Sequence, residues 1–201
     1  MLERLACGEL PPKHHVALHG PGQALRYEAC LTRGGFEGGY TITYHEHRPQ
    51  ALRAVGDPVA IPLAAAGSGP ASLARRHYRT AELLGGTPSG QALPLLYNDD
   101  VVIGCRLPDR DDATYQMNAG ADELCFALSG NGTLRTPLGD LEFGAGDYVY
   151  LPKGLLYRVL CAPGERRHWL SLELSAGFGI PGHFRNPLGQ LRMDAPYCHR
   201  D

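Results

Sequence analysis

The stretch ELCFALSGNGTLRTPLGDLEFGAGDYVYLPKGLLY, residues 123–157, decides the fold of this protein. It consists of short apolar and β-branched runs that are separated by turn-forming residues. Pro137–Asp140 and Gly144–Asp147 have the composition of tight turns between neighbouring antiparallel strands. The stretch therefore predicts a series of short strands joined by hairpins, without a long helix.

The same pattern extends on both sides of this stretch. The 26 glycines and 16 prolines mark frequent turns along the chain. The expected strands comprise residues 95–97, 101–105, 123–128, 132–136, 141–143, 148–151, 157–161 and 168–174. Short strands at such close and regular spacing predict a meander or a jelly roll that closes into a small barrel.

The rest of the chain is organised around this barrel. The β-branched and aromatic run at residues 40–45 predicts a further strand, and the small uncharged residues 64–72 favour a loop. Residues 73–84 are compatible with a short helix or with a strand at 77–80. We therefore expect an all-β protein whose parts are an N-terminal β-rich arm, a barrel and an irregular tail, at residues 1–92, 93–175 and 176–201.

Composition narrows the class of protein. A length of 201 residues with 43% hydrophobic and 20% charged residues is typical of a soluble globular chain. The net charge of −2 does not favour nucleic acid or an anionic membrane as a partner. No apolar run approaches the ~20 residues that a membrane span needs, and charged residues interrupt the N-terminus where a signal peptide would be apolar. The six cysteines lack metal-binding or paired spacing, so we expect a cytoplasmic protein with reduced thiols.

Two fixed spacings in the barrel region resemble the cupin superfamily of small β-barrels. Glu123 is followed seven residues later by Gly130, and Gly146 is followed by Pro152 and Gly154 at the spacing of the second cupin motif. The resemblance implies that the paired histidines, the glutamate and the last histidine of the two motifs hold a metal ion. In this chain the four positions are occupied by Gln116, Asn118, Glu123 and Tyr157.

These substitutions argue against a metal ion in the barrel. A divalent transition metal needs three or four ligands of the imidazole, thiolate or carboxylate type, and a neutral amide or an un-ionised phenol is a poor substitute. Glu123 is then either a structural carboxylate, hydrogen-bonded to Asn118, Gln116 or Tyr157, or the general base of a metal-free pocket. The four residues are our candidates for such a pocket, and we assign no catalytic residue and no metal ligand.

Other histidines do not clearly replace the missing ligands. His45 and His47 flank Glu46, so on a strand both rings would lie on one face, but Pro49 ends the strand and no third ligand is nearby. His14 and His15 are adjacent and would point apart on an extended chain. We expect these histidines to be surface or packing residues.

A second resemblance covers most of the chain. The segments that carry it are ELPPKHH (9–15), GGFEG (34–38), YHEHRP (44–49), LPLLYNDDV (93–101), NAGADELCFALSGNGTL (118–134), GDYVYLPKG (146–154), YRV (157–159) and APYCHRD (195–201). In this order they resemble the N-terminal half of a homogentisate 1,2-dioxygenase, and more narrowly its shorter bacterial relatives. The departures lie mainly between residues 50 and 75.

The resemblance implies a non-haem iron oxygenase that cleaves the ring of a dihydroxylated aromatic acid. It implies that this β-domain is metal-free and structural, that iron(II) is bound by two histidines and a glutamate of a C-terminal domain, and that the protein forms a trimer-based homo-oligomer. We expect the chain to end where that catalytic half would begin, so no iron ligand can be placed on it and the chain alone should be inactive. The alternatives are a free-standing metal-free cupin that binds a small ligand and a purely structural subunit.

Overall fold

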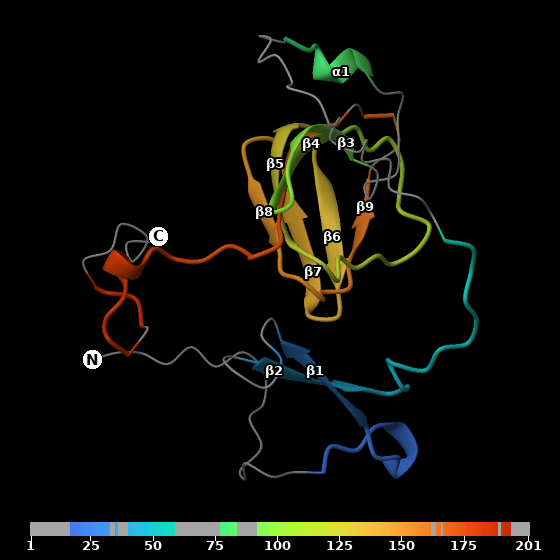
Figure 1. Ribbon diagram of the computed structural model, residues 1–201. Coiled ribbons are helices and arrows are strands. Elements are labelled where there is room, and N and C mark those ends of the chain that lie inside the picture. The colour runs from blue at the N-terminus through green and yellow to red at the C-terminus, as the bar shows by residue number, and fades with distance from the viewer. Residues whose placement is uncertain are drawn as a thin grey trace. The chain divides into compact units, whose positions relative to one another are not determined.

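The computed structural model of the protein describes residues 17–32, 35, 40–58, 77–83, 92–161, 164, 165, 167–188 and 190–193. The chain divides into two compact units, Met1–Pro62 and Leu63–Asp201 (Figure 1). The boundaries expected from the sequence, at residues 92 and 175, stay predictions. Within the described residues, no helix combines the length and the apolar character that crossing a membrane would require.

A single hairpin dominates the described part of the first unit. Strands β1 (Tyr27–Thr32) and β2 (Tyr40–His45) pair antiparallel, with Cys30 opposite Ile42. A short 3-10 turn, η1 (Pro21–Gln23), precedes them. The sequence predicted β2 but not β1, because YEACLT contains Glu and Ala, which are depleted in strands. Pairing with β2 supplies the stability that this segment lacks on its own.

Two antiparallel sheets form the second unit, as Figure 1 shows. The strands are β3 (Leu93–Tyr97), β4 (Val101–Arg106), β5 (Asp122–Ser129), β6 (Gly132–Thr136), β7 (Gly139–Phe143), β8 (Tyr148–Leu151), β9 (Arg158–Leu160) and β10 (His168–Leu174). The five-stranded sheet has the order β3-β4-β10-β5-β8, and the three-stranded sheet has the order β7-β6-β9. The expected strands of the barrel are confirmed, and the expected jelly-roll arrangement follows from this topology.

The two undecided segments of the sequence have different outcomes. In the 73–84 region the described part is a short helix, α1 (Thr80–Leu83), and residues 77–79 are not a strand. The loop expected at residues 64–72 lies outside the described residues. After β10 the chain forms a 3-10 turn, η2 (Gly182–Phe184), and an isolated bridge between Arg185 and Leu191.

The core of the second unit lies between its two sheets. Along β5, Glu123, Cys125 and Ala127 are buried at alternate positions, as the period of a strand requires. Opposite them on β10 lie Ser171 and Trp169, in register with Cys125 and Ala127. The alternation brings one carboxylate and one thiol into an otherwise mainly apolar core.

Aromatic packing closes this core from the three-stranded sheet. The ring of Phe143 on β7 meets Trp169 edge-on, with the ring centroids 5.2 Å apart. Leu134 and Val159 are buried beside them, from β6 and β9. Burying each of these large side chains contributes about 1.5–3 kcal/mol, so this contact between the sheets is a main source of the barrel's stability.

Candidate functional site

Glu123, the one metal-motif carboxylate in the sequence, lies in a buried ionic cluster. Its side chain is only 5% exposed, and its Oε2 accepts a hydrogen bond from Arg106 Nη2 at 2.8 Å. The Tyr157 hydroxyl donates a second hydrogen bond to the same oxygen at 3.1 Å. A buried carboxylate needs such partners, and the alternative of a structural Glu123 bonded to Tyr157 agrees with this geometry.

Arg106 connects this carboxylate to a second one. The guanidinium comes from the end of β4, where Arg106 lies opposite Trp169 of β10, and its side chain is 3% exposed. Arg106 Nη2 lies 3.5 Å from Glu173 Oε1, and its Nη1 donates to the Tyr157 hydroxyl at 3.5 Å. The Glu173 side chain is 27% exposed, so the cluster reaches from the barrel interior toward its surface.

Asn118 joins the cluster through Glu173. Its Nδ2 donates to Glu173 Oε2 at 3.2 Å, and its Oδ1 accepts from the backbone amides of Gly120 and Ala121. The amide therefore fixes the turn that leads into β5 while it holds the outer carboxylate. This arrangement is an Asx-type turn, for which a short amide side chain is well suited.

The side chain of Gln116 points elsewhere. Its Nε2 donates to Asp112 Oδ2 at 2.8 Å, and the same Asp112 oxygen accepts from the Val159 amide. The backbone of Gln116 forms an isolated antiparallel bridge with Tyr157, a member of the cluster. Of the four residues selected from the sequence, Glu123 and Tyr157 are in direct contact, Asn118 is linked through Glu173, and Gln116 belongs to another contact.

Sequence reasoning missed Arg106, Glu173 and Asp112. A signal was present for Arg106, since strand alternation from Gly104 places it on the inner face of β4. Arginine is rarely fully buried, and its position at the end of an apolar run favours a solvated strand terminus. Only the pairing of β4 with β10 shows that a carboxylate lies within reach.

Burial governs the protonation of the cluster. It raises the pKa of the Tyr157 phenol well above its ordinary value; Arg106 opposes this shift and Glu123 adds to it. Burial likewise raises the pKa of the Cys125 thiol, and the nearby Arg106 charge offsets this only in part. At neutral pH the phenol and the thiol therefore keep their protons, and Tyr157 acts as a hydrogen-bond donor.

This donor set does not fit a divalent metal ion. Oε2 of Glu123 is bound by a guanidinium, Tyr157 is protonated, and the Gln116 amide donates to Asp112. Iron in cupin-like oxygenases needs imidazole and carboxylate donors around open positions. In the part of the chain that the structure describes, no three His, Cys, Asp or Glu side chains are grouped as metal ligands.

The alternative histidine ligands are not assembled into a site. His45 Nε2 lies 2.8 Å from the Thr43 hydroxyl on the same strand, and His47 is exposed in the turn after β2. His14 and His15 lie outside the described residues. The pair around Glu46 thus has the surface or packing character expected from the sequence.

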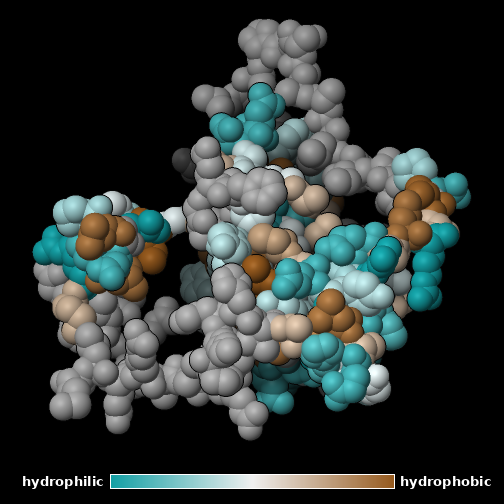
Figure 2. Space-filling model, turned by 90° about the horizontal axis from the view of Figure 1, so that it is seen from below, coloured by the Kyte–Doolittle hydropathy of each residue, from teal (hydrophilic) through white to brown (hydrophobic). Residues whose placement is uncertain are grey.

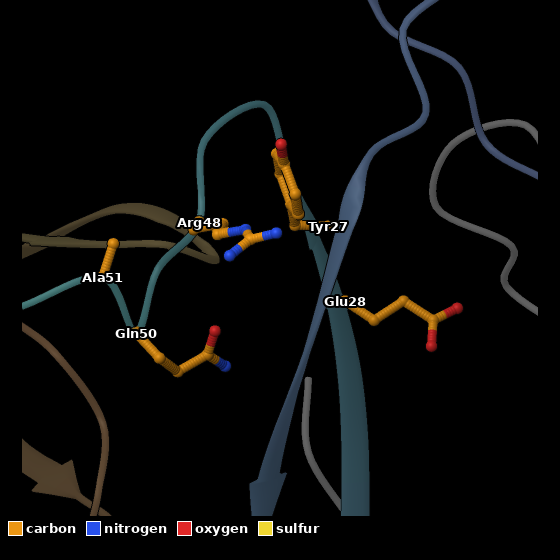
Figure 3. A pocket seen from close by; sticks show the side chains of 5 residues that line it. All are labelled: Tyr27, Glu28, Arg48, Gln50 and Ala51. Carbon is orange, nitrogen blue, oxygen red and sulfur yellow. The ribbon is translucent and has the colours of Figure 1, made fainter.

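The described residues also line open hollows, one of which lies in the first unit and another on the barrel. In the first unit Tyr27, Arg48, Gln50 and Ala51 surround about 360 Å³, with the Arg48 guanidinium 5.5 Å from the centre of the Tyr27 ring (Figure 3). Figure 3 shows the Glu28 carboxylate directed away from this space. A groove of about 520 Å³ lies on the barrel, and its lining includes Asp111, Thr133, Glu142 and Cys161.

The surface offers little further guidance to a binding site. Figure 2 shows mostly hydrophilic side chains on the face seen from below, with hydrophobic ones in small separate groups. Scattered exposed apolar residues are normal for soluble proteins. This face therefore carries no broad apolar patch among the described residues.

Comparison with known proteins agrees with the barrel topology. Residues 112–170 match the family described as "EutQ-like cupin domain". A protein of Saccharolobus solfataricus named "Putative dioxygenase" is 25% identical over 197 residues, which cover 96% of this chain and 50% of the relative. The chain thus spans about half the length of this curated relative.

Solved structures with similar folds include two bacterial proteins. The cupin-2 domain containing protein of Shewanella frigidimarina is 14% identical with a TM-score of 0.38, and the match covers 44% of this chain and 83% of that one. A Klebsiella pneumoniae protein with a double-stranded β-helix domain is 13% identical with a TM-score of 0.43, covering 51% and 91%. Residues 112–170 thus resemble a cupin domain, and the two antiparallel sheets that contain them have the all-β character of a cupin fold.

Proposed function

We propose that this cupin domain is the metal-free, structural half of a homogentisate 1,2-dioxygenase-like oxygenase, which opens the ring of a dihydroxylated aromatic acid. The observation that carries the proposal is the set of partners that the side chains at the four metal-motif positions have. Glu123 is held by Arg106, Tyr157 is a protonated donor, and the amides of Gln116 and Asn118 are used in hydrogen bonds to other carboxylates. These are the features of a supporting domain rather than of an iron centre.

The identity of the whole enzyme rests on two further supports. The motifs from residue 9 to residue 201 follow the order of the N-terminal half of the homogentisate dioxygenases. The Saccharolobus relative is named a dioxygenase and is about twice as long as the matched region. We propose that the iron ligands, two histidines and a glutamate, belong to a catalytic domain outside these 201 residues, in the same polypeptide or in a separate one.

One domain would then carry out catalysis, and the other would support it structurally. When bound, iron(II) in the catalytic domain would bring dioxygen and the aromatic diol together. The cupin domain described here would supply a rigid wall and subunit contacts in a trimer-based, cytoplasmic homo-oligomer. Its buried ion pairs suit that task, because breaking one of them by loss of a partner is costly.

Iron content and oxygen uptake test this proposal. The purified chain is incubated with iron(II) without oxygen, desalted, assayed for iron, and then given 2,5-dihydroxyphenylacetate in an oxygen electrode. We expect no stoichiometric iron and no oxygen uptake from this chain alone. Stoichiometric iron, together with uptake that Glu123→Gln abolishes, would refute the structural assignment and make the barrel the active site.

The native form of the protein tests the proposed partner. An antibody against the chain is used to isolate the protein from its own cells, and the mass and iron content of the product are measured. We expect either a longer polypeptide or a complex that contains iron and consumes oxygen with the aromatic diol. An iron-free product of this mass without a partner would contradict the dioxygenase proposal and support a small-ligand cupin.

A further inference from the structure

The interior of the barrel holds a fixed positive charge where carboxylates converge. Arg106 Nη2 is 2.8 Å from Glu123 Oε2 and 3.5 Å from Glu173 Oε1. Tyr157, at the position of the last histidine of the second motif, also meets this guanidinium, at 3.5 Å from Nη1. One cationic group therefore contacts two of the metal-motif positions directly and a third, Asn118, through Glu173.

We infer that the Arg106 guanidinium is a built-in cation, which organises the interior of this barrel as a bound metal ion would and keeps divalent metals out. This inference rests on the proposed function and deepens it, because it explains physically why this domain binds no metal ion. Arginine keeps its charge at all ordinary pH values, and its planar fork holds two acceptors in fixed directions. Unlike a metal ion, it has no open coordination position and cannot dissociate from the barrel.

The geometry explains why the guanidinium and a metal ion exclude each other. A transition metal bound to a Glu123 oxygen would lie about 2.0–2.2 Å from it. Arg106 Nη2 is already 2.8 Å from Oε2 of that carboxylate, so the metal and the guanidinium would lie only a few ångströms apart. In a desolvated interior, repulsion between like charges at this distance is strong, and the covalently attached cation is always present.

Burial of the partners makes the exclusion stringent. The Arg106 and Glu123 side chains are 3% and 5% exposed, so water cannot screen the repulsion between two cations there. Glu173 is more exposed, at 27%, and could adapt to a new cation by a small movement. If Arg106 is removed, Glu123 and Glu173 are left as two facing carboxylates that attract a replacement cation.

Cation replacement distinguishes a built-in cation from an ordinary ion pair. The variants are Arg106→Ala, Arg106→Ala with Glu123→Gln, and Arg135→Ala, which removes an exposed arginine from its pair with Asp140. Co²⁺ binding is measured by equilibrium dialysis at neutral pH, and melting temperature is measured with and without methylguanidinium, against sodium chloride at the same ionic strength.

The expected pattern is specific to Arg106. The wild-type chain and Arg135→Ala bind no stoichiometric Co²⁺, and methylguanidinium does not raise their melting temperature. Arg106→Ala binds Co²⁺ measurably more tightly than the wild-type chain, since Glu123 and Glu173 then face each other without a cation between them, and methylguanidinium raises its melting temperature. The double variant loses both effects, because one of the two carboxylates has become neutral.

The unfavourable outcomes separate the two proposals. If Arg106→Ala folds but responds to neither cation, the inference is overturned while the metal-free domain stands. If the wild-type chain binds Co²⁺ in a way that Glu123→Gln abolishes, the inference and the proposed function both fail.

A variant pair covers the case in which Arg106→Ala does not fold. Replacing both charges with apolar side chains, Arg106→Met with Glu123→Leu, should give a barrel that melts above either single variant, because no buried charge is left without its partner. A double variant that melts no higher than the singles would overturn the inference.

Discussion

Asp122→Asn is the substitution that most directly tests how the barrel is held around its cluster. Asp122 precedes Glu123 on β5 and is 2% exposed. Its Oδ1 accepts from the Lys153 amide at 2.9 Å, and its Oδ2 accepts from the Tyr150 hydroxyl at 2.8 Å and from the Phe178 amide at 2.9 Å. One carboxylate thus connects β5 to the β8 strand, to the turn after it and to the chain after β10.

The cost of this change follows from the number of donors. An asparagine has one acceptor oxygen, so its NH₂ group must face either the Lys153 amide or the Phe178 amide and leave that backbone donor unsatisfied. An unsatisfied buried donor costs about 1–3 kcal/mol. The remaining hydrogen bonds change from charged to neutral acceptors, which removes about 1 kcal/mol more. We expect a loss of about 3 kcal/mol in the free energy of unfolding.

Urea unfolding measured by tryptophan fluorescence tests this value. The single tryptophan of the chain, Trp169, lies in the barrel core and reports on that unit. At an m-value of about 2 kcal/mol/M, the midpoint should fall by roughly 1.5 M. Tyr150→Phe removes one of the hydrogen bonds and should cost about 1 kcal/mol, whereas Asp140→Asn at the exposed Arg135 pair should leave the midpoint unchanged. A loss below about 1 kcal/mol for Asp122→Asn would refute the reasoning.

Two further predictions concern the core of the barrel. Gly130 has φ +82°, and an added Cβ would overlap Arg167 Cγ, so Gly130→Ala should lower the free energy of unfolding by about 3 kcal/mol. Gly154 has φ +84° but open space around it, so Gly154→Ala should cost only about 1 kcal/mol. Equal losses in thermal or urea unfolding would contradict the steric argument. Burial raises the pKa of the Cys161 thiol to about 11, so its alkylation by iodoacetamide should accelerate roughly tenfold per pH unit up to that value. At pH 8 peptide mass spectrometry should find the exposed Cys30 labelled before the buried Cys161, and equal labelling of these two would refute the burial argument.

The strands of the barrel were predictable because their signals are local. β6, β8 and β10 begin and end at the residues that the sequence indicates, since turn residues with fixed chemistry flank each of them. The hairpin turn between β3 and β4 is equally local, as Asn98 Oδ1 accepts from the amides of Asp100 and Val101. β1 was missed because its strand character depends on pairing with β2 and not on its own residues.

The candidate site was predictable only in part. Fixed motif spacing identified Glu123 and Tyr157, which are indeed hydrogen-bonded to each other. The same spacing included Gln116, whose side chain instead binds Asp112. Motif offsets place backbone positions on strands, but they do not decide which of several polar neighbours a flexible side chain will choose.

The sequence by itself therefore determined the strand order along the chain, the turns and the identity of the residues at the positions that resemble the cupin motifs. Tertiary structure alone decided what occupies the interior in their place. Arg106 and Glu123 are distant in sequence, and they meet because β10 pairs with both β4 and β5. The strength of their interaction depends on the exclusion of water by strands from both sheets, and this is a property of the closed barrel that no segment has alone.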